Sequence, residues 1–274
     1  MARLDSLNIL TTGEGREKLA ESYGKVIENI QKSTISGLLK NTDLSGTPEA
    51  GTVEAKRFVN STAAAYGTAR AGGKGEALKA VPVVIAIDTD KEIINEVEEK
   101  DTALYGVDGL IAKKAAMNEK AMKRELERAF FTVAGNQGTT ATLEATAINE
   151  KVEELIQLVE NTKNDYVDGV DRDMISVVLD TKTYGALRNY LDSTAVANVD
   201  TAVGEMGMFH GVRVFSSVYT GKSMIAMVDG AVAQPVLTTL DEAGKIPMSN
   251  AYHFGLFYSY GTKAVMPDLI QVVA

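Results

Sequence analysis

The chain has 274 residues, is 45% hydrophobic and 24% charged, carries a formal net charge of −9 and contains no cysteine. The length allows one large domain or two closely joined ones, and the missing cysteines exclude a disulfide framework, a thiolate metal site and a cysteine nucleophile. The acidic balance disfavours a surface that grips phosphate backbones, and the longest apolar stretch, residues 80–87, is too short to cross a bilayer.

The N-terminal third predicts an arm, a helix and a long hairpin. Residues 1–12 show no periodicity, whereas residues 14–31 carry apolar side chains at helical spacing. After a turn-rich break, segments 52–59 and 77–87 read as two strands around a glycine-rich tip at residues 71–75. The first of these strands has few large apolar residues, so we expect the hairpin to lie against a partner.

Two helices are expected next. Residues 89–92 (TDKE) match a capping box, which predicts a helix start, and an acidic run follows up to residue 101. A long helix is predicted from Gly109 to Ala134, with an apolar stripe along its second half, and residues 135–138 (GNQG) suit its end.

The second half of the chain mixes strands and helices. Asn149 is the expected cap of an amphipathic helix, and a shorter helix is expected over residues 181–191. Strands are expected at residues 174–179, 211–218, 223–228, 231–237, 252–260, 263–266 and 269–273. Because helices and strands do not alternate regularly, the predicted fold class is α+β.

Charge is distributed unevenly between the hairpin and the segment after it. Residues 50–80 hold five bases and two acids, whereas residues 89–101 hold two bases and six acids. These segments could pair within a subunit or between neighbours, or they could be two separately solvated surfaces. The candidate contact residues are Lys56, Arg57, Arg70, Lys74, Glu96, Glu98 and Glu99.

Motifs for catalysis or cofactor binding are incomplete. Gly221-Lys222-Ser223 ends like a phosphate-binding loop but lacks its first glycine and leads into a predicted strand. The only histidines, His210 and His253, have no neighbouring ligand motif. The acidic stretch at residues 168–173 lacks the calcium-loop pattern. We therefore predict no catalytic, cofactor-binding or metal-binding residues, and a protein that is not an enzyme.

The order of these elements resembles a known family, the major capsid proteins of tailed phages, which share the Hong Kong 97 phage capsid fold with encapsulin compartments. The segments that carry the resemblance are GTVEAKRF at 51–58, VPVVIAID at 81–88, KEI at 91–93, ISVVL at 175–179, TY at 183–184, GVRV at 211–214 and GAV at 230–232. No single one of them is diagnostic, and the similarity lies in their order along nearly the whole chain.

The resemblance implies a subunit that assembles with itself as pentamers and hexamers into an icosahedral shell around phage double-stranded DNA. It implies a separate scaffolding protein, a portal, no small-molecule substrate, no cofactor and no membrane. The location would be the virion, after assembly in the host bacterial cytoplasm. It also implies an N-terminal arm and helix (1–50), an extended hairpin loop (51–87), a peripheral domain with the spine helix (88–145 and 251–274) and an axial domain (146–250).

Two other readings of the sequence stay open. An encapsulin-like compartment would have the same fold but a protein cargo, and the helix at residues 14–31 could line its inner surface. A tail-tube subunit would be another self-assembling phage protein, although the long helix argues against it. An enzyme ranks behind both, because convergent titratable groups are missing.

Overall fold

The computed structural model describes residues 17, 20–22, 25, 34–61, 65–67, 79–193, 207–240 and 244–274, with the backbone alone at 99, 101–105, 107, 108, 193 and 240. The expected N-terminal arm and hairpin tip lie outside the described residues, as does most of the expected N-terminal helix. The chain divides into two compact units. Unit 1 is Met1–Leu38, Ile87–Glu127 and Pro235–Gly261, and unit 2 is Leu39–Ala86, Arg128–Gln234 and Thr262–Ala274.

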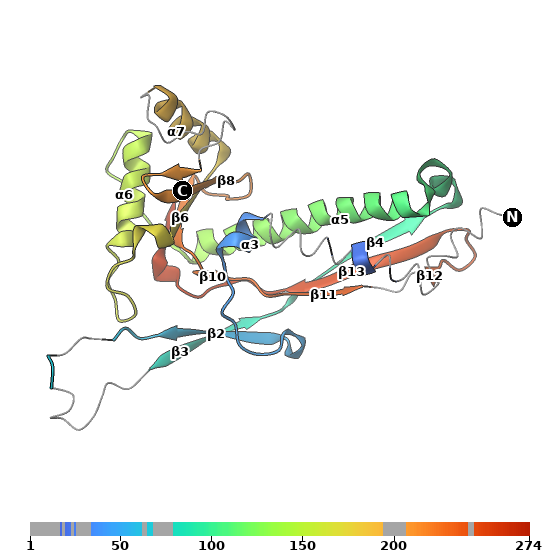
Figure 1. The fold of residues 1–274 in the computed structure, drawn as a ribbon, viewed down its shortest axis with the longest axis horizontal. Coiled ribbons are helices and arrows are strands. Elements are labelled where there is room, and N and C mark those ends of the chain that lie inside the picture. Colours follow the sequence, from blue (N-terminus) through green and yellow to red (C-terminus); the bar gives the residue numbers. More distant parts are fainter. Residues whose placement is uncertain are drawn as a thin grey trace. The chain divides into compact units, whose positions relative to one another are not determined.

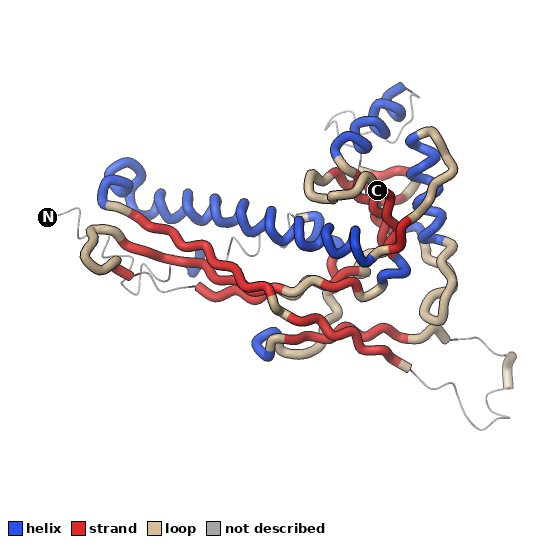
Figure 2. Tube along the Cα trace, turned by 180° about the vertical axis from the view of Figure 1, so that it is seen from behind, coloured by secondary structure: helices blue, strands red, loops and turns tan. Residues whose placement is uncertain are grey.

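Unit 1 is a four-stranded sheet beside a long helix. The strands are β4 (Thr89–Val97), β11 (Val236–Leu240), β12 (Gly244–Lys245) and β13 (Tyr252–Tyr260). β13 is the central strand and pairs antiparallel with the other three. Helix α5 (Glu99–Gln137) belongs to this unit up to Glu127, and Figures 1 and 2 show it running along β4 and β13. The short helix α3 (Ile35–Leu39) joins the unit through Glu127, whose carboxylate accepts the Ile35 amide.

The helix expected to begin at residue 89 is wrong, because this segment is strand β4. Its whole length pairs with β13, from Thr89 opposite Tyr260 to Val97 opposite Tyr252. The capping-box pattern is a local signal worth about 1 kcal/mol. Nine residues of ladder with an aromatic-rich strand outweigh it, and the β-branched side chains of the segment suit a strand.

The long helix was predicted correctly but starts earlier than expected. α5 begins at Glu99 in place of Gly109, and it contains a break at Gly106, where φ is 66° and ψ is 171°. A left-handed φ of this kind costs glycine little, because it has no Cβ. The acidic run therefore ends inside the first turns of this helix.

Unit 2 contains a six-stranded sheet in the order β5-β15-β9-β6-β8-β7. The strands are β5 (Thr139–Thr140), β6 (Ile175–Leu179), β7 (Met208–Phe209), β8 (Val212–Ser216), β9 (Met224–Val228) and β15 (Ile270–Val273). Helices α6 (Ile148–Glu160) and α7 (Thr181–Ser193) cover one face and share a core with it. β6 and β9 are buried at every position, so both faces of the sheet are covered.

The end of α5 meets this sheet closely. A Cβ added to Gly138 would lie 2.6 Å from Cγ2 of Ile270 and 2.9 Å from Cγ2 of Val272, which only glycine can accommodate. The Gln137 side chain accepts the Ala264 amide at 2.9 Å. The GNQG end of the helix was therefore predicted correctly, and its last glycine permits close approach to β15.

The expected cap of the next helix is wrong. α6 begins at Ile148 with Ala147 at the cap position, and the Asn149 Oδ1 is buried without a hydrogen-bond partner. The strand expected over residues 231–237 is two strands in different sheets, β10 (Val232–Ala233) and β11. Pro235 separates them, and a proline cannot donate to a ladder.

The remaining elements of unit 2 are a small sheet, three short turns and the hairpin. β1 (Lys40–Asn41), β10 and β14 (Lys263–Ala264) form a small sheet. The turns η2 (Pro48–Ala50), η3 (Arg172–Met174) and η4 (Pro267–Leu269) precede β2, β6 and β15. The predicted hairpin is confirmed: β2 (Thr52–Phe58) and β3 (Ala80–Ala86) pair antiparallel along seven residues each.

Candidate assembly surfaces

The inward face of the β2–β3 hairpin is fixed to its own unit. Val53, Ala55 and Ile85 are buried in one cluster with Ala233 and Val265. Alternate residues of a strand point to opposite faces, so this burial leaves the other residues of both strands facing outward. The hairpin therefore packs against the rest of its unit through one face only, in a small apolar cluster.

The outward face of the hairpin mixes charge with exposed apolar side chains. The register places Lys56 opposite Pro82 and Phe58 opposite Ala80, with Val84 on the same face. Phe58 is 47% exposed and Val84 is 45% exposed. Single exposed apolar residues are common on proteins, but here they sit on neighbouring strands beside a lysine. Glu54 lies on this face too, opposite Val84. We call Glu54, Lys56, Phe58, Pro82 and Val84 the outward hairpin face.

Arg57 points the other way and forms an ion pair near the end of the strand pair that leads to the tip. Its two terminal nitrogens donate to the two carboxylate oxygens of Asp268 in η4, at 2.6 Å and 2.5 Å. The guanidinium lies 4.0 Å from the ring centroid of Tyr166, and Asn164 donates a further hydrogen bond to Asp268. Bidentate arginine–carboxylate pairs of this kind are strong and directional.

The ion pair also shifts the Asp268 carboxyl. Its partial burial alone would raise the pKa of Asp268. The hydrogen bond from Arg57, the backbone amide of Asp268 itself and the Asn164 amide outweigh that burial, and together they hold the pKa of Asp268 below its ordinary value. A backbone hydrogen bond of 2.9 Å from Asn60 to Asp165 fastens the same part of the hairpin to the loop after α6.

The predicted basic residues thus separate into different environments. Lys56 lies on the outward hairpin face, whereas Arg57 is held inside its own unit with only 12% of its side chain exposed. Arg70 and Lys74 lie outside the described residues. The sequence could not indicate the partners of Arg57, because Asp268 is 211 residues away.

The predicted acidic residues lie at the end of β4 and just after it. β4 alternates, so Asp90, Glu92, Ile94 and Glu96 share one face, and Ile94 is 54% exposed. We call these four residues the acidic face of β4. Asp90 and Glu92 are two residues apart, which places them on the same face if the segment is a strand. The count of charges in the sequence did not use this spacing.

The other two predicted acids lie beyond this face. Glu98 is exposed and forms a 2.6 Å ion pair with Lys100, and Glu99 begins helix α5. Exposed pairs of this kind contribute little to stability. The acidic segment is therefore a strand face followed by a helix start, in place of the predicted acidic helix.

The opposite face of β4 carries a partly exposed polar network with α5. Glu125 of α5 accepts a hydrogen bond from the Tyr260 hydroxyl at 3.0 Å and pairs with Lys91 at 3.1 Å. Burial, together with the negative charge of Glu125, raises the pKa of Tyr258 to about 12, and burial with the same carboxylate also raises that of Tyr260. Both tyrosine hydroxyls stay un-ionised at neutral pH, and the hydrogen bond from Tyr260 to Glu125 ties α5 to the sheet.

The described titratable residues form ion pairs and do not make a recognisable catalytic or metal-binding group. Arg172 joins Glu153 and Glu160, and His210 contacts Glu153. Asp168 pairs with Lys163 at 2.9 Å, and His253 lies on β13 opposite Glu96. In the part of the chain that the structure describes, no three His, Asp or Glu side chains are grouped to hold a metal. None of the described helices is apolar over a length that could cross a bilayer.

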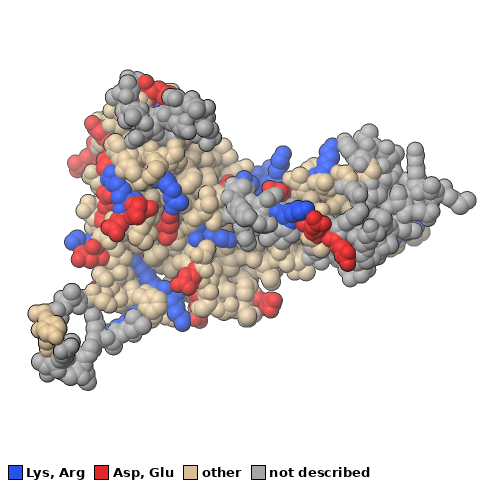
Figure 3. Space-filling view, viewed as in Figure 1, with Lys and Arg blue, Asp and Glu red and all other residues tan. Residues whose placement is uncertain are grey.

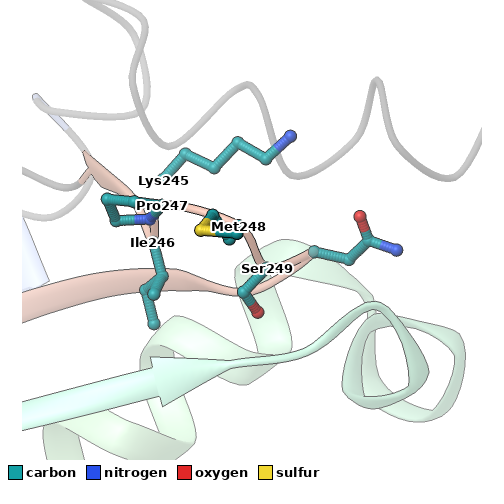
Figure 4. Close-up of a pocket in the computed structure, with 6 residues that line it drawn as sticks. Lys245, Ile246, Pro247, Met248 and Ser249 are labelled. Atoms are coloured by element: carbon teal, nitrogen blue, oxygen red, sulfur yellow. The ribbon is translucent and has the colours of Figure 1, made fainter.

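One shallow pocket lies at the turn between β12 and β13. It is lined by Lys245, Ile246, Pro247, Met248, Ser249 and Asn250. Figure 4 shows the Lys245 and Ile246 side chains extending to opposite sides of the turn. Its single ionisable side chain has no acid or base beside it in the pocket, and catalysis requires such groups to converge.

The charged side chains on one side of the molecule are intermingled. Figure 3 shows Lys and Arg beside Asp and Glu over much of the described surface on that side. Binding to the phosphates of a nucleic acid requires clustered positive charge, and the charges on this face are mixed. This face therefore lacks the charge pattern of a nucleic-acid-binding surface.

The fold has counterparts among solved structures. It is similar to the capsid structure of the cyanophage P-SCSP1u, with a TM-score of 0.60 and 13% identity over 88% of each chain. It is also similar to a virus-like particle from Pyrococcus furiosus, with a TM-score of 0.57 and 14% identity over 94% of this chain and 98% of that one. A third match, to Mycobacterium phage Che8, has a TM-score of 0.57 and 18% identity over 81% and 84% of the two chains.

No family model and no curated protein sequence matches the chain. The structural matches are nevertheless extensive, since they span most of both chains in each pair. The chain therefore has the capsid fold of the Hong Kong 97 type, and the predicted α+β class is confirmed.

Proposed function

We propose that this chain is the major capsid protein of a tailed phage, a structural subunit and not an enzyme. The observation that carries the proposal is the match to the cyanophage capsid structure over 88% of both chains. A fold hosts many functions in general, so the contact surfaces supply the second support. The hairpin presents apolar side chains beside Lys56 on its outward face, which suits burial against another subunit.

The finer parts of this proposal follow from the same role. The subunits would form pentamers and hexamers of an icosahedral shell in the host cytoplasm, with a separate scaffolding protein, a portal and packaged double-stranded DNA as partners. The four parts would be the arm (1–50), the hairpin loop (51–87), the peripheral domain (88–145 and 251–274) and the axial domain (146–250).

The direct test is the assembly state of the purified chain. We expect closed particles, or capsomers that convert to them, by negative-stain microscopy and sedimentation velocity. A chain that stays monomeric at all salt concentrations and pH values, also when co-expressed with a scaffolding protein, would contradict the proposal.

We further propose that the outward hairpin face contacts the acidic face of β4 in a neighbouring subunit, as part of a contact that includes the candidates Arg70, Lys74, Glu98 and Glu99. The support is the match of Lys56 and its apolar neighbours on one surface with Glu92 and Glu96 beside Ile94 on the other. The acid Glu54 at the other end of the hairpin face would have to lie outside the pairing of Lys56 with these acids. Complementary charges of this kind set orientation and register between partners. Arg57 is already bound to Asp268, so its role would be to hold the hairpin in place.

A charge swap tests this contact. Lys56→Glu should lower the particle yield roughly tenfold, because it places like charges opposite each other, while the melting temperature of the subunit stays unchanged. Glu96→Lys alone should have a similar effect, and the two changes together should restore assembly. Normal particles from Lys56→Glu would reject the contact, and failure of the double variant to assemble would reject Glu96 as the partner.

A second candidate is an encapsulin-like compartment around a protein cargo. The match to a virus-like particle from Pyrococcus furiosus extends over 94% of this chain and supports a particle of this fold, whatever its contents. The contents of the particle distinguish the candidates. Nuclease-protected double-stranded DNA in particles from infected cells supports the phage capsid, and particles that hold protein and no DNA support the compartment.

A further inference from the structure

The turn between β12 and β13 holds a methionine in a backbone conformation that methionine rarely adopts. The Ser249 amide donates to the Ile246 carbonyl at 3.2 Å, which closes a four-residue turn with Pro247 and Met248 at its centre. Met248 has a φ of 60°. Proline fixes a negative φ, so this is a turn of type II, whose third position favours glycine or asparagine. A methionine at this position strains the backbone.

Further hydrogen bonds hold the turn in this shape. The Ile246 amide donates to the Ala251 carbonyl at 2.9 Å, and the Ala251 amide donates to Oγ of Ser249 at 3.1 Å. The strands on either side of the turn pair antiparallel, with Lys245 opposite Tyr252. The left-handed conformation of Met248 is therefore imposed by an ordered turn.

The Met248 side chain gains no burial within its own subunit. It is fully exposed, and it has the highest exposed fraction of the large apolar residues that the structure describes. An exposed apolar side chain alone needs no explanation, but here exposure is combined with backbone strain. Asparagine or glycine would fit the turn without strain. A contact outside the subunit therefore explains the methionine better than the fold of the subunit does.

The turn is also free of charge. Residues 246–251 (IPMSNA) are all uncharged, although 24% of the chain is charged, and residues 247–250 are exposed. The centres of protein interfaces are poor in charged residues and rich in methionine and aromatic residues. A contact between two identical surfaces needs this more than others do, because a charge would face its own copy. Lys245 precedes the turn, and its long side chain can keep the ammonium in solvent.

We propose that Met248 packs against the same turn of a neighbouring subunit, in a contact between identical surfaces. This inference rests on the proposed function, since a self-assembling chain brings copies of the turn together. Each Met248 would lie in the shallow pocket that Ile246, Pro247 and Ser249 help to line in the other copy (Figure 4). The strained methionine thus lowers the stability of the subunit and strengthens its assembly.

Two substitutions separate the strain from the contact. Met248→Asn suits the left-handed φ and removes the apolar side chain. The melting temperature of dissociated subunits should therefore stay unchanged or rise by about 1–3 °C. The protein concentration needed for assembly, measured by sedimentation velocity, should rise about tenfold. Met248→Leu keeps both the strain and an apolar side chain, so it should assemble like the wild type.

Three results with these variants would overturn the proposal. The first is assembly of Met248→Asn at the wild-type concentration. The second is a lower melting temperature of this variant, which would show that Met248 stabilises its own subunit. The third is a Met248→Leu variant that assembles as poorly as Met248→Asn.

The lack of cysteine in the chain allows a direct test of the contact between identical turns. Met248→Cys should give disulfide-linked dimers in oxidised particles, because a disulfide requires Cα atoms within about 7 Å of each other. Val218→Cys is the control, since Val218 is 69% exposed in unit 2 and should stay reduced. Particles in which Met248→Cys links no more than Val218→Cys would overturn this proposal and leave the proposed function intact. A wild-type chain that forms no particles would contradict both.

Discussion

The six-stranded sheet and the β2–β3 hairpin belong to the same unit but use their strands in opposite ways. β6 and β9 are buried at every position, so each of their side chains contributes to the core. The hairpin buries only alternate residues and leaves Phe58 and Val84 about half exposed. The difference indicates that the sheet contributes more to the stability of the unit than the hairpin does, whereas the hairpin leaves apolar surface exposed.

The largest expected effect is on the stability of the six-stranded sheet and the helix packed on it. Leu155→Ala on α6 should lower the free energy of unfolding by about 2–5 kcal/mol, because Leu155 is fully buried beneath the sheet and truncation leaves a cavity. Leu158→Ala on the same helix is the matched control, since Leu158 is 39% exposed and its change should cost less than about 1 kcal/mol. Urea unfolding of dissociated subunits measures both. Equal losses in the two variants would show that α6 does not seal this core.

A smaller effect is expected at the ion pair of Arg57, near the end of the strand pair that leads to the tip. Arg57→Ala leaves Asp268 without its main partner and should destabilise the hairpin by about 1–3 kcal/mol. Hydrogen exchange over β2 and limited proteolysis of the hairpin would report it. Lys56→Ala, one residue earlier on the outward face, should change the stability of the subunit by less than about 0.5 kcal/mol. If both variants loosen β2 alike, the division between a structural Arg57 and an outward Lys56 is wrong.

The sequence predicted these two regions with unequal success. The buried strand at residues 175–179 and the arms of the hairpin were predicted because apolar runs and a glycine-rich tip are local signals. The ion pair of Arg57 with Asp268 was not predicted, since its partners are 211 residues apart and no pattern around either indicates the other. Contacts of this kind depend on the whole fold.

The secondary structure of β4 also could not be predicted from local sequence patterns. The local capping pattern predicted a helix, but the segment is a strand because it pairs with β13, which lies far along the chain. Ser259 of β13 donates a hydrogen bond to Asp90, 169 residues away. The charge count nevertheless identified an acidic surface correctly, because charge belongs to the residues whichever element they form. What the sequence could not supply was which acids share a face, and this requires the register with β13.

The smallest predicted effect concerns a buried carboxylate at the junction between α3 and α5. Glu127 is buried and accepts the Ile35 amide, and burial raises its pKa in spite of that hydrogen bond and the nearby Lys123. A raised folded-state pKa means that the folded chain binds this proton more tightly than the unfolded chain does. The resulting stability is full below the ordinary carboxyl value and is lost as the pH rises through the raised one.

Glu127→Gln should therefore reduce the loss of stability that occurs as the pH rises through the raised pKa of Glu127. The glutamine oxygen can still accept the Ile35 amide, but the side chain no longer has a charge to bury, so we expect a modest gain in melting temperature at neutral pH and none at pH 4. Melting curves at half-unit pH steps measure the difference. A variant that is less stable than the wild type at neutral pH would show that the charged hydrogen bond outweighs the cost of burying the carboxylate. In that case Glu127 would stabilise the contact between α3 and α5 as an anion.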